Sequence, residues 1–109
     1  MDFQEYQKQA GKTSIFPKDG RAYVYAVLGL SGETGEVAEK VKKIIVNNGG
    51  VISEEARAEI KKELGDVLWY LSQLATELGL SLDEVAVENV RKIHDRMKRG
   101  VLKGDGDNR

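Results

Sequence analysis

The sequence predicts an all-α protein, folded as an antiparallel four-helix bundle. Three observations support this fold class: Pro17 is the only proline among 109 residues, the alternating pattern of strands is absent, and apolar residues recur every three or four positions. Short loops between long amphipathic helices favour antiparallel neighbours. A chain of this length is expected to form one domain, residues 1–109.

The first two predicted helices flank a loop. A short helix near residues 2–12 precedes the loop from Gly11 to Gly20, which contains the proline and an Asp-Gly pair. A long helix then runs from about Arg21 to Val46, and Asn47-Asn48-Gly49-Gly50 ends it because Asn and Gly tolerate the left-handed conformation that closes helices. One face of this helix carries Val27, Leu30, Thr34, Val37, Val41 and Ile44.

Serine residues mark the starts of the last two predicted helices. Ser53 is a favourable N-cap with acidic residues after it, and Gly79 ends that helix. Its apolar face consists of Ile60, Leu64, Val67, Leu71, Leu74 and Leu78. The fourth helix begins with a capping box formed by Ser81 and Glu84, and residues 100–109 are expected to form an extended tail.

Composition excludes several classes of protein. The net charge is −1, so no excess of positive charge indicates binding to a nucleic acid polymer. With no cysteine, the chain lacks disulfides, thiolate zinc ligands and a cysteine nucleophile, which fits a reducing cytoplasm. No apolar run is long enough to span a membrane, and the N-terminus lacks the pattern of a signal peptide. We expect a cytoplasmic protein without a membrane partner.

Two pairs of carboxylates lie on the second and third predicted helices. Glu33 and Glu36 are three residues apart, as are Glu63 and Asp66, so each pair shares one helix face. A helix–turn–helix hairpin with 26 residues between the pairs brings them to the same level. Four unpaired carboxylates would raise each other's pKa values, and Mg²⁺ or Mn²⁺, which prefer carboxylate oxygens, would remove that repulsion. The alternative is an acidic face that only contacts solvent.

Glycines accompany the first pair of carboxylates. Each glycine in a helix interior costs up to about 1 kcal/mol relative to alanine, so three in one helix need a reason. Gly29 and Gly32 share a sector with the two glutamates, and Gly35 follows. Their small size either lets a ligand or another backbone come close or allows tight helix packing.

Further candidates for ligand binding lie on the third and fourth predicted helices. Tyr70 lies one turn after Asp66, where its ring would stack either on a planar ligand or within the core. Asn89, Lys92 and Arg96 follow one line of the fourth helix. Residues 91–109 hold seven Lys or Arg against three Asp, and such cations near a carboxylate–metal cluster suit a polyphosphate ligand. A solvated basic face is the alternative.

Missing motifs narrow the choice of chemistry. The chain has no GxxxxGK[ST] sequence and hence no P-loop. Its single histidine, His94, forms neither HExxH nor the ExxH of di-iron bundles, because position 91 is arginine. We expect His94 to be a surface histidine or one with satisfied hydrogen bonds, and not a metal ligand.

Two segments of the chain resemble MazG-like nucleotide pyrophosphohydrolases, which belong to the all-α NTP pyrophosphatase superfamily. They are GLSGETGEV from Gly29 to Val37 and KELGDVLWYL from Lys62 to Leu71. The mark of the superfamily is ExxE on one helix and ExxD on the next. The resemblance covers most of the chain, so residues 1–109 are expected to form a single domain of this kind.

The resemblance implies Mg²⁺-dependent hydrolysis of a (deoxy)nucleoside triphosphate to the monophosphate and pyrophosphate, with Mn²⁺ as a substitute ion. The positions that match the metal-binding and catalytic carboxylates are Glu33, Glu36, Glu63 and Asp66. The positions that match nucleotide-binding residues are Tyr70, Asn89, Lys92 and Arg96. Some relatives have another Glu where this chain has Gly32, so the general base stays open among Glu33, Glu36 and Glu63.

Two alternative functions stay open at this point. One is a non-catalytic helical module that binds nucleotide or metal, and the other is an enzyme like phosphoribosyl-ATP pyrophosphohydrolase. A cleft between only two helices would hardly enclose a nucleotide. We therefore predict a homodimer or homotetramer in which helices of two chains complete each site.

Overall fold

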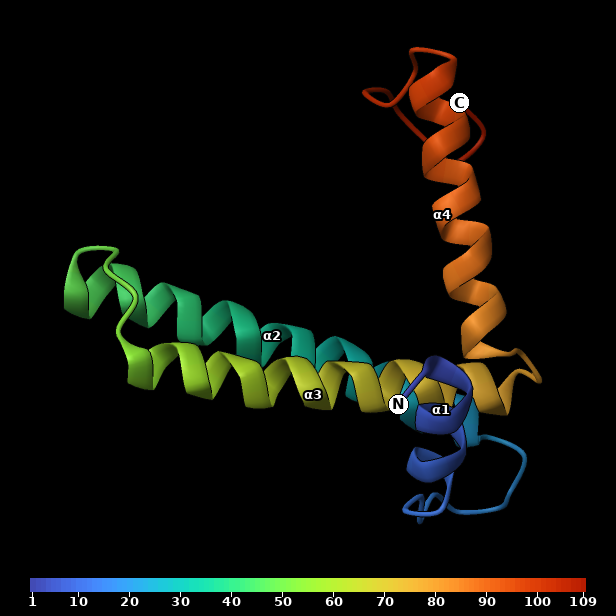
Figure 1. Cartoon of the computed structure of the whole chain (residues 1–109). Coiled ribbons are helices and arrows are strands. Elements are labelled where there is room, and N and C mark those ends of the chain that lie inside the picture. Colours follow the sequence, from blue (N-terminus) through green and yellow to red (C-terminus); the bar gives the residue numbers. More distant parts are fainter.

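Four helices and no strand make up the computed structural model, which describes residues 1–109 (Figure 1). The helices are α1 (Phe3–Gly11), α2 (Ala22–Asn48), α3 (Glu54–Glu77) and α4 (Leu82–Lys98). Each begins and ends within two residues of its predicted bounds, and the all-α class is confirmed. No helix has both the length and the apolar character needed to cross a membrane.

Local capping marks the starts of α3 and α4 and the end of α2. The Ser53 hydroxyl accepts a hydrogen bond from the Ala56 N–H at 3.1 Å, and the Ser81 hydroxyl accepts one from the Glu84 N–H at 3.2 Å. Only this half of the predicted capping box is formed. Gly49 closes α2 with a φ of 58°, a left-handed conformation that favours glycine.

The α2–α3 pair forms a long antiparallel hairpin, and the other helices are attached to one end of it (Figure 1). Helix α1 packs across α3, whereas α4 contacts α1 and α3 but not α2 and points steeply away from the hairpin. The radius of gyration is 16.8 Å, compared with about 13 Å for a compact chain of this length. One chain therefore contains the four helices of the predicted bundle without closing it.

Few side chains are buried within one chain. Only 8 of 109 residues are buried, and Ile44 is the one member of the two predicted apolar faces among them. Other members stay exposed: the exposed fraction is 42% for Val41 and 54% for Leu64. Apolar surface of this extent is typical of a surface that contacts another protein.

Gln7 fixes the position of α1 against the α3–α4 junction. Its amide nitrogen donates to the Thr76 hydroxyl at 3.0 Å and to the Leu80 carbonyl at 2.9 Å. Its amide oxygen accepts from the N–H of Leu82, the buried first residue of α4, at 2.9 Å. One side chain thus joins three segments of the chain.

Aromatic residues attach the α1–α2 loop to the hairpin. The Phe16 ring lies 5.6 Å from the Trp69 ring and 6.4 Å from the Tyr70 ring, centroid to centroid. The Trp69 indole N–H donates to the Thr13 hydroxyl at 2.9 Å. Trp69 is therefore part of the aromatic core that these rings form.

The C-terminal segment is not the extended tail expected from the sequence, because it folds back on the end of α4. The Arg109 guanidinium donates to the carbonyls of Val101 and Leu102, both at 3.1 Å. Arg99 in turn donates to the Arg109 carbonyl at 2.7 Å. A terminal arginine has five donors, enough to bind several carbonyls of a turn at once.

Gly29 is the glycine that the hairpin needs. A Cβ atom at this position would overlap the Tyr70 ring, whereas a Cβ at Gly35 would meet no atom within 4 Å. Overlap in a packed site costs about 1–3 kcal/mol, and alanine regains up to about 1 kcal/mol of helix propensity. We predict that Gly29→Ala lowers Tm and that Gly35→Ala raises it, in thermal unfolding followed by circular dichroism. An increase in Tm for both variants would contradict the packing of Tyr70 on Gly29.

Candidate functional site

Carboxylates from α2 and α3 meet near the middle of the hairpin. Oxygen atoms of Glu33, Glu63 and Asp66 all lie within 4.8 Å of one another, and we call these three residues the acidic cluster. Glu33 and Glu63 are half-buried, and Asp66 is exposed. The antiparallel hairpin therefore brings one carboxylate of α2 and two of α3 together.

Glu36 is the predicted member that lies outside this group. It is one turn further along α2 than Glu33, and its side chain is exposed. Its negative charge nevertheless contributes to raising the pKa of Glu33. Three of the four predicted carboxylates thus converge, and the fourth lies at the edge of the cluster.

The pKa of Glu33 is raised above its ordinary value. The largest cause is loss of water around its carboxylate, followed by its close approach to Glu63 and the negative charges of Asp66, Glu63 and Glu36. The ionised form of Glu33 is therefore unfavourable in the folded chain. The free energy of unfolding of the chain falls as pH rises through this raised pKa. A cation bound among these oxygens would reverse the effect.

Two residues near the acidic cluster were not predicted from the sequence. The Lys40 ammonium lies 3.6 Å from a Glu63 oxygen and 3.8 Å from a Glu59 oxygen. Lys40 follows Glu33 by seven residues, so helical spacing along α2 was a usable signal. The pKa of Tyr6 is raised by burial and then by the charge of Asp66, and no periodicity links these residues because they come from different helices.

The glycines of α2 have different surroundings. Gly29 packs against Tyr70, which is the tight packing named as one alternative. Gly32 and Gly35 have no atom within 4 Å of the place a Cβ would occupy. The helix surface next to Glu33 and Glu36 is therefore open to a ligand or to a second chain.

Tyr70 belongs to the aromatic core of the single chain. Its ring is half-buried over Gly29, 4.9 Å from the Trp69 ring in an edge-to-face arrangement. The core setting predicted for Tyr70 is thus the one that the structure supports. A contact with a ligand stays a prediction.

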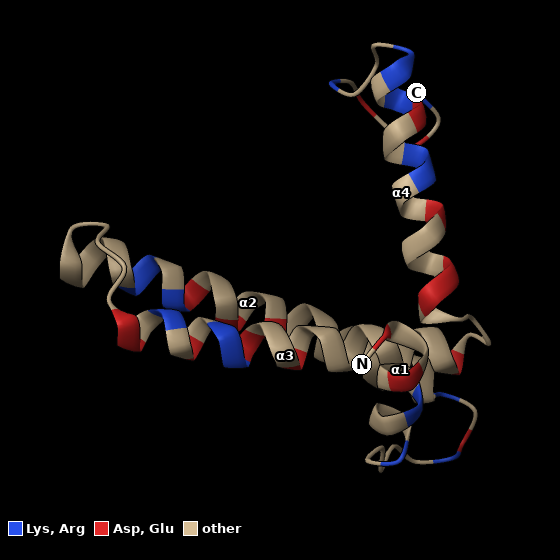
Figure 2. Ribbon diagram, viewed as in Figure 1, with Lys and Arg blue, Asp and Glu red and all other residues tan.

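The basic residues predicted to bind substrate are not near the acidic cluster of their own chain, since α4 does not contact α2. Lys92 and Arg96 instead hold the Asp107 carboxylate at 3.1 and 3.2 Å. Hydrogen bonds from these two cations lower the pKa of Asp107. Arg96 is buried by this contact, and Asn89 is exposed. Lys and Arg gather toward the end of α4 (Figure 2).

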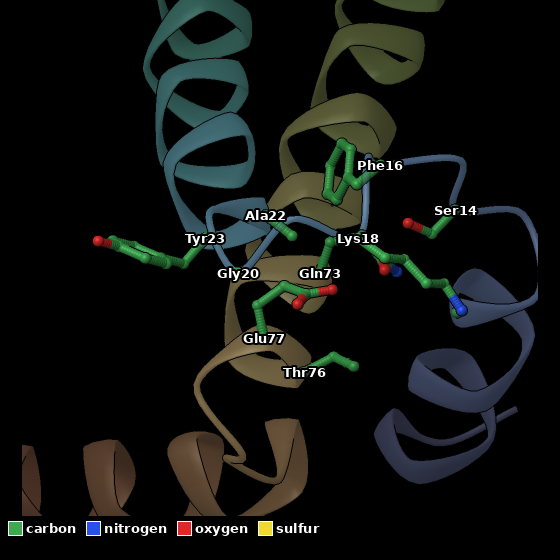
Figure 3. A pocket seen from close by; sticks show the side chains of 10 residues that line it. Ser14, Phe16, Lys18, Gly20, Ala22, Tyr23, Gln73, Thr76 and Glu77 are labelled. Atoms are coloured by element: carbon green, nitrogen blue, oxygen red, sulfur yellow. The ribbon is translucent and has the colours of Figure 1, made fainter.

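A cavity of about 550 Å³ includes no residue of the acidic cluster. It lies where the α1–α2 loop meets the C-terminal part of α3 (Figure 3). Phe16 lines this cavity and also stacks on Tyr70, which follows Asp66 by one helical turn. The cavity and the cluster are therefore neighbouring features of the hairpin.

Comparisons with known proteins show which sequences this chain is similar to. The family model for the MazG nucleotide pyrophosphohydrolase domain matches residues 24–101, which include both carboxylate pairs and α4. The Gene 37 protein of Mycobacterium phage L5 is 45% identical over 109 residues, which cover 95% of this chain and 96% of that protein. No solved structure matches the chain.

The raised pKa of Glu33 generates a test of stability. In EDTA near pH 7, we expect Glu33→Gln to raise Tm by a few degrees, because the variant removes a poorly solvated charge from the cluster. The difference should shrink at low pH, where wild-type Glu33 is protonated. Glu55→Gln, at an exposed carboxylate in the first turn of α3 and outside the cluster, should not raise Tm, because a negative charge at the start of a helix is favourable. A lower Tm for Glu33→Gln at neutral pH would contradict the repulsion.

Proposed function

The chain belongs to the MazG nucleotide pyrophosphohydrolase family, and from this premise we propose that it hydrolyses nucleoside or deoxynucleoside triphosphates to the monophosphate and pyrophosphate. The observation that supports the proposal most directly is the acidic cluster, with three carboxylates from two helices within 4.8 Å of one another. A bound cation explains why such mutually repelling groups are held together. The 45% identical phage relative has a printed name that states no activity.

The acidic cluster fits Mg²⁺, with Mn²⁺ as a substitute. Its donors are carboxylate oxygens, which both ions prefer, and the raised pKa of Glu33 reflects negative charge that a cation would offset. Glu33, Glu63 and Asp66 would hold the ion, with Glu36 at the edge of its site. When bound, Mg²⁺ lowers the pKa of a coordinated water and neutralises charge on phosphate oxygens.

Glu36 is the carboxylate that we assign as general base. It lies one turn from Glu33 on α2, exposed and outside the group of three converging oxygens. Its carboxylate is therefore free to accept the proton of an attacking water. Gly32 and Gly35 leave open space on this helix, through which a water and a phosphate chain can reach Glu36.

Lys92 and Arg96 would bind those phosphate groups whose negative charge the cation in the acidic cluster does not neutralise. They already bind the Asp107 carboxylate, so their geometry suits an anion. Because α4 does not contact α2 in its own chain, we propose that α4 of a second chain supplies them, together with Asn89. The protein would then act as a homodimer or homotetramer.

Activity separates the roles of the carboxylates. With Mg²⁺ and a panel of nucleoside triphosphates, we expect Glu63→Gln and Asp66→Asn to reduce pyrophosphate release at least ~100-fold, since even groups that only orient metal ligands are worth 10- to 100-fold. Both variants should also lose the rise in Tm that Mg²⁺ gives the wild type. Glu36→Gln should lose activity but keep that rise, and Glu55→Gln should keep both.

The same assay distinguishes the alternatives. Nucleotide binding without turnover in the wild type would favour a non-catalytic module. Phosphoribosyl-ATP as the preferred substrate in the panel would favour the related enzyme class. Full activity in both Glu63→Gln and Asp66→Asn would contradict the metal assignment.

A charge placed on the exposed apolar face of α4 tests whether the protein forms an oligomer. Val90, Ile93 and Met97 are 50%, 40% and 60% exposed in the single chain, so a second chain is expected to cover them. Light scattering should give a mass at least twice 12.1 kDa for the wild type. Ile93→Asp should shift the protein to the monomer with loss of activity, whereas the same charge at the exposed neighbour His94 should leave the assembly intact. A stable, active wild-type monomer would contradict the shared site.

A further inference from the structure

The cavity beside the α1–α2 loop has the lining of a binding site for a planar polar ring. Its volume is about 550 Å³, within the range of small-molecule pockets, which combine apolar walls with a few polar groups. Phe16 supplies an aromatic wall, and Gln73 and Glu77 come from α3 (Figure 3). Ser14 and Lys18 of the loop add a hydroxyl and a cation.

Gln73 is the unusual residue of this cavity. Only 1% of its surface is exposed, and its amide nitrogen has no hydrogen-bond partner in the protein. A buried amide donor without a partner costs free energy, and native proteins contain few of them. An apolar side chain at this position would avoid the cost. The amide is therefore explained by a polar group that it meets in the cavity.

The position of Gln73 relates the cavity to the acidic cluster. Gln73 follows Asp66 by seven residues, so both lie on nearly the same face of α3, about 10 Å apart along its axis. Tyr70 lies between them on that face, and its ring stacks with Phe16 of the cavity wall at an interplanar angle of 22°. This separation matches the reach of a nucleotide from its phosphates to the far edge of its base.

We propose that the cavity binds the base of the nucleotide and that Gln73 determines which base is accepted. The inference rests on the proposed function, because it places the phosphates of the same ligand at the acidic cluster. A glutamine amide offers a donor and an acceptor side by side and pairs with a base edge that presents the same two groups, as glutamine does with adenine. Phe16 stacks on the ring, and Ser14, Lys18 and Glu77 meet its remaining polar atoms.

Binding of deoxynucleoside monophosphates in EDTA tests the cavity without metal and without hydrolysis. We expect one of the four common monophosphates to bind the full-length protein more tightly than the others, by calorimetry. Gln73→Leu, which keeps the volume of the side chain and removes the amide, should weaken that binding at least ten-fold. Gln4→Leu, an exposed glutamine of α1, should bind as the wild type does. Equal binding by Gln73→Leu would overturn the proposal.

A measurement on the wild type guards against a variant that fails to fold. The side-chain amide of Gln73 gives its own pair of NMR signals in ¹⁵N-labelled protein. Saturable addition of the preferred monophosphate should shift them. If none of the four monophosphates moves these signals, the base does not occupy the cavity.

The two proposals fail in different ways. If the wild type releases pyrophosphate and Gln73→Leu retains the same ratios of kcat/KM among the bases, the base site is wrong and the hydrolase stands. If the monophosphate binds through Gln73 but no triphosphate is cleaved, the hydrolase is wrong and the base site stands. In EDTA, Glu63→Gln should bind the monophosphate at least as tightly as the wild type does, since the variant removes a negative charge near the phosphate and leaves the lining of the cavity unchanged.

Discussion

Mutual repulsion among three carboxylates is the constraint on which the structure depends. Glu33 approaches Glu63 and Asp66 although their negative charges contribute to raising the pKa of Glu33. The α2–α3 hairpin holds them there through contacts elsewhere, among them the packing of the Tyr70 ring over Gly29. The hairpin fixes the positions of the carboxylates, and the repulsion between their charges destabilises the folded chain. A divalent cation bound among them would offset this repulsion and stabilise the fold.

The sequence predicted what is local. Serine caps and left-handed glycines set the ends of the helices, and a spacing of three residues placed each carboxylate pair on one face. It did not predict the direction of α4 or the return of the C-terminal segment, because Gln7 and Arg109 set these through contacts between distant segments. The burial of Gln73 beside the cavity was not predicted for the same reason, since a single glutamine among apolar residues produces no periodic pattern in the sequence.

The proposed oligomer would account both for the exposed apolar face of α4 and for the distance between the basic residues of α4 and the carboxylates of α2. A single chain leaves the apolar face of α4 uncovered and holds Lys92 and Arg96 away from the carboxylates on α2. Packing α4 against a second chain would cover that face and would bring cations toward anions in the same step. In the single chain, the Asp107 carboxylate forms ion pairs with Lys92 and Arg96. A bound phosphate would replace this carboxylate, so neither cation would be left without an anion.

The carboxylates assigned to the metal and the residues proposed to recognise the base lie in different parts of the chain. The family match spans residues 24–101, which hold every carboxylate assigned to metal or proton transfer. The loop that carries Ser14, Phe16 and Lys18 lies before that segment, and it faces Gln73 across the cavity. Phe16 links the two parts, since its ring lines the cavity and packs against Trp69 and Tyr70. If the cavity binds the base as proposed, changes in the loop would alter the accepted base while the hairpin retains the geometry of its carboxylates.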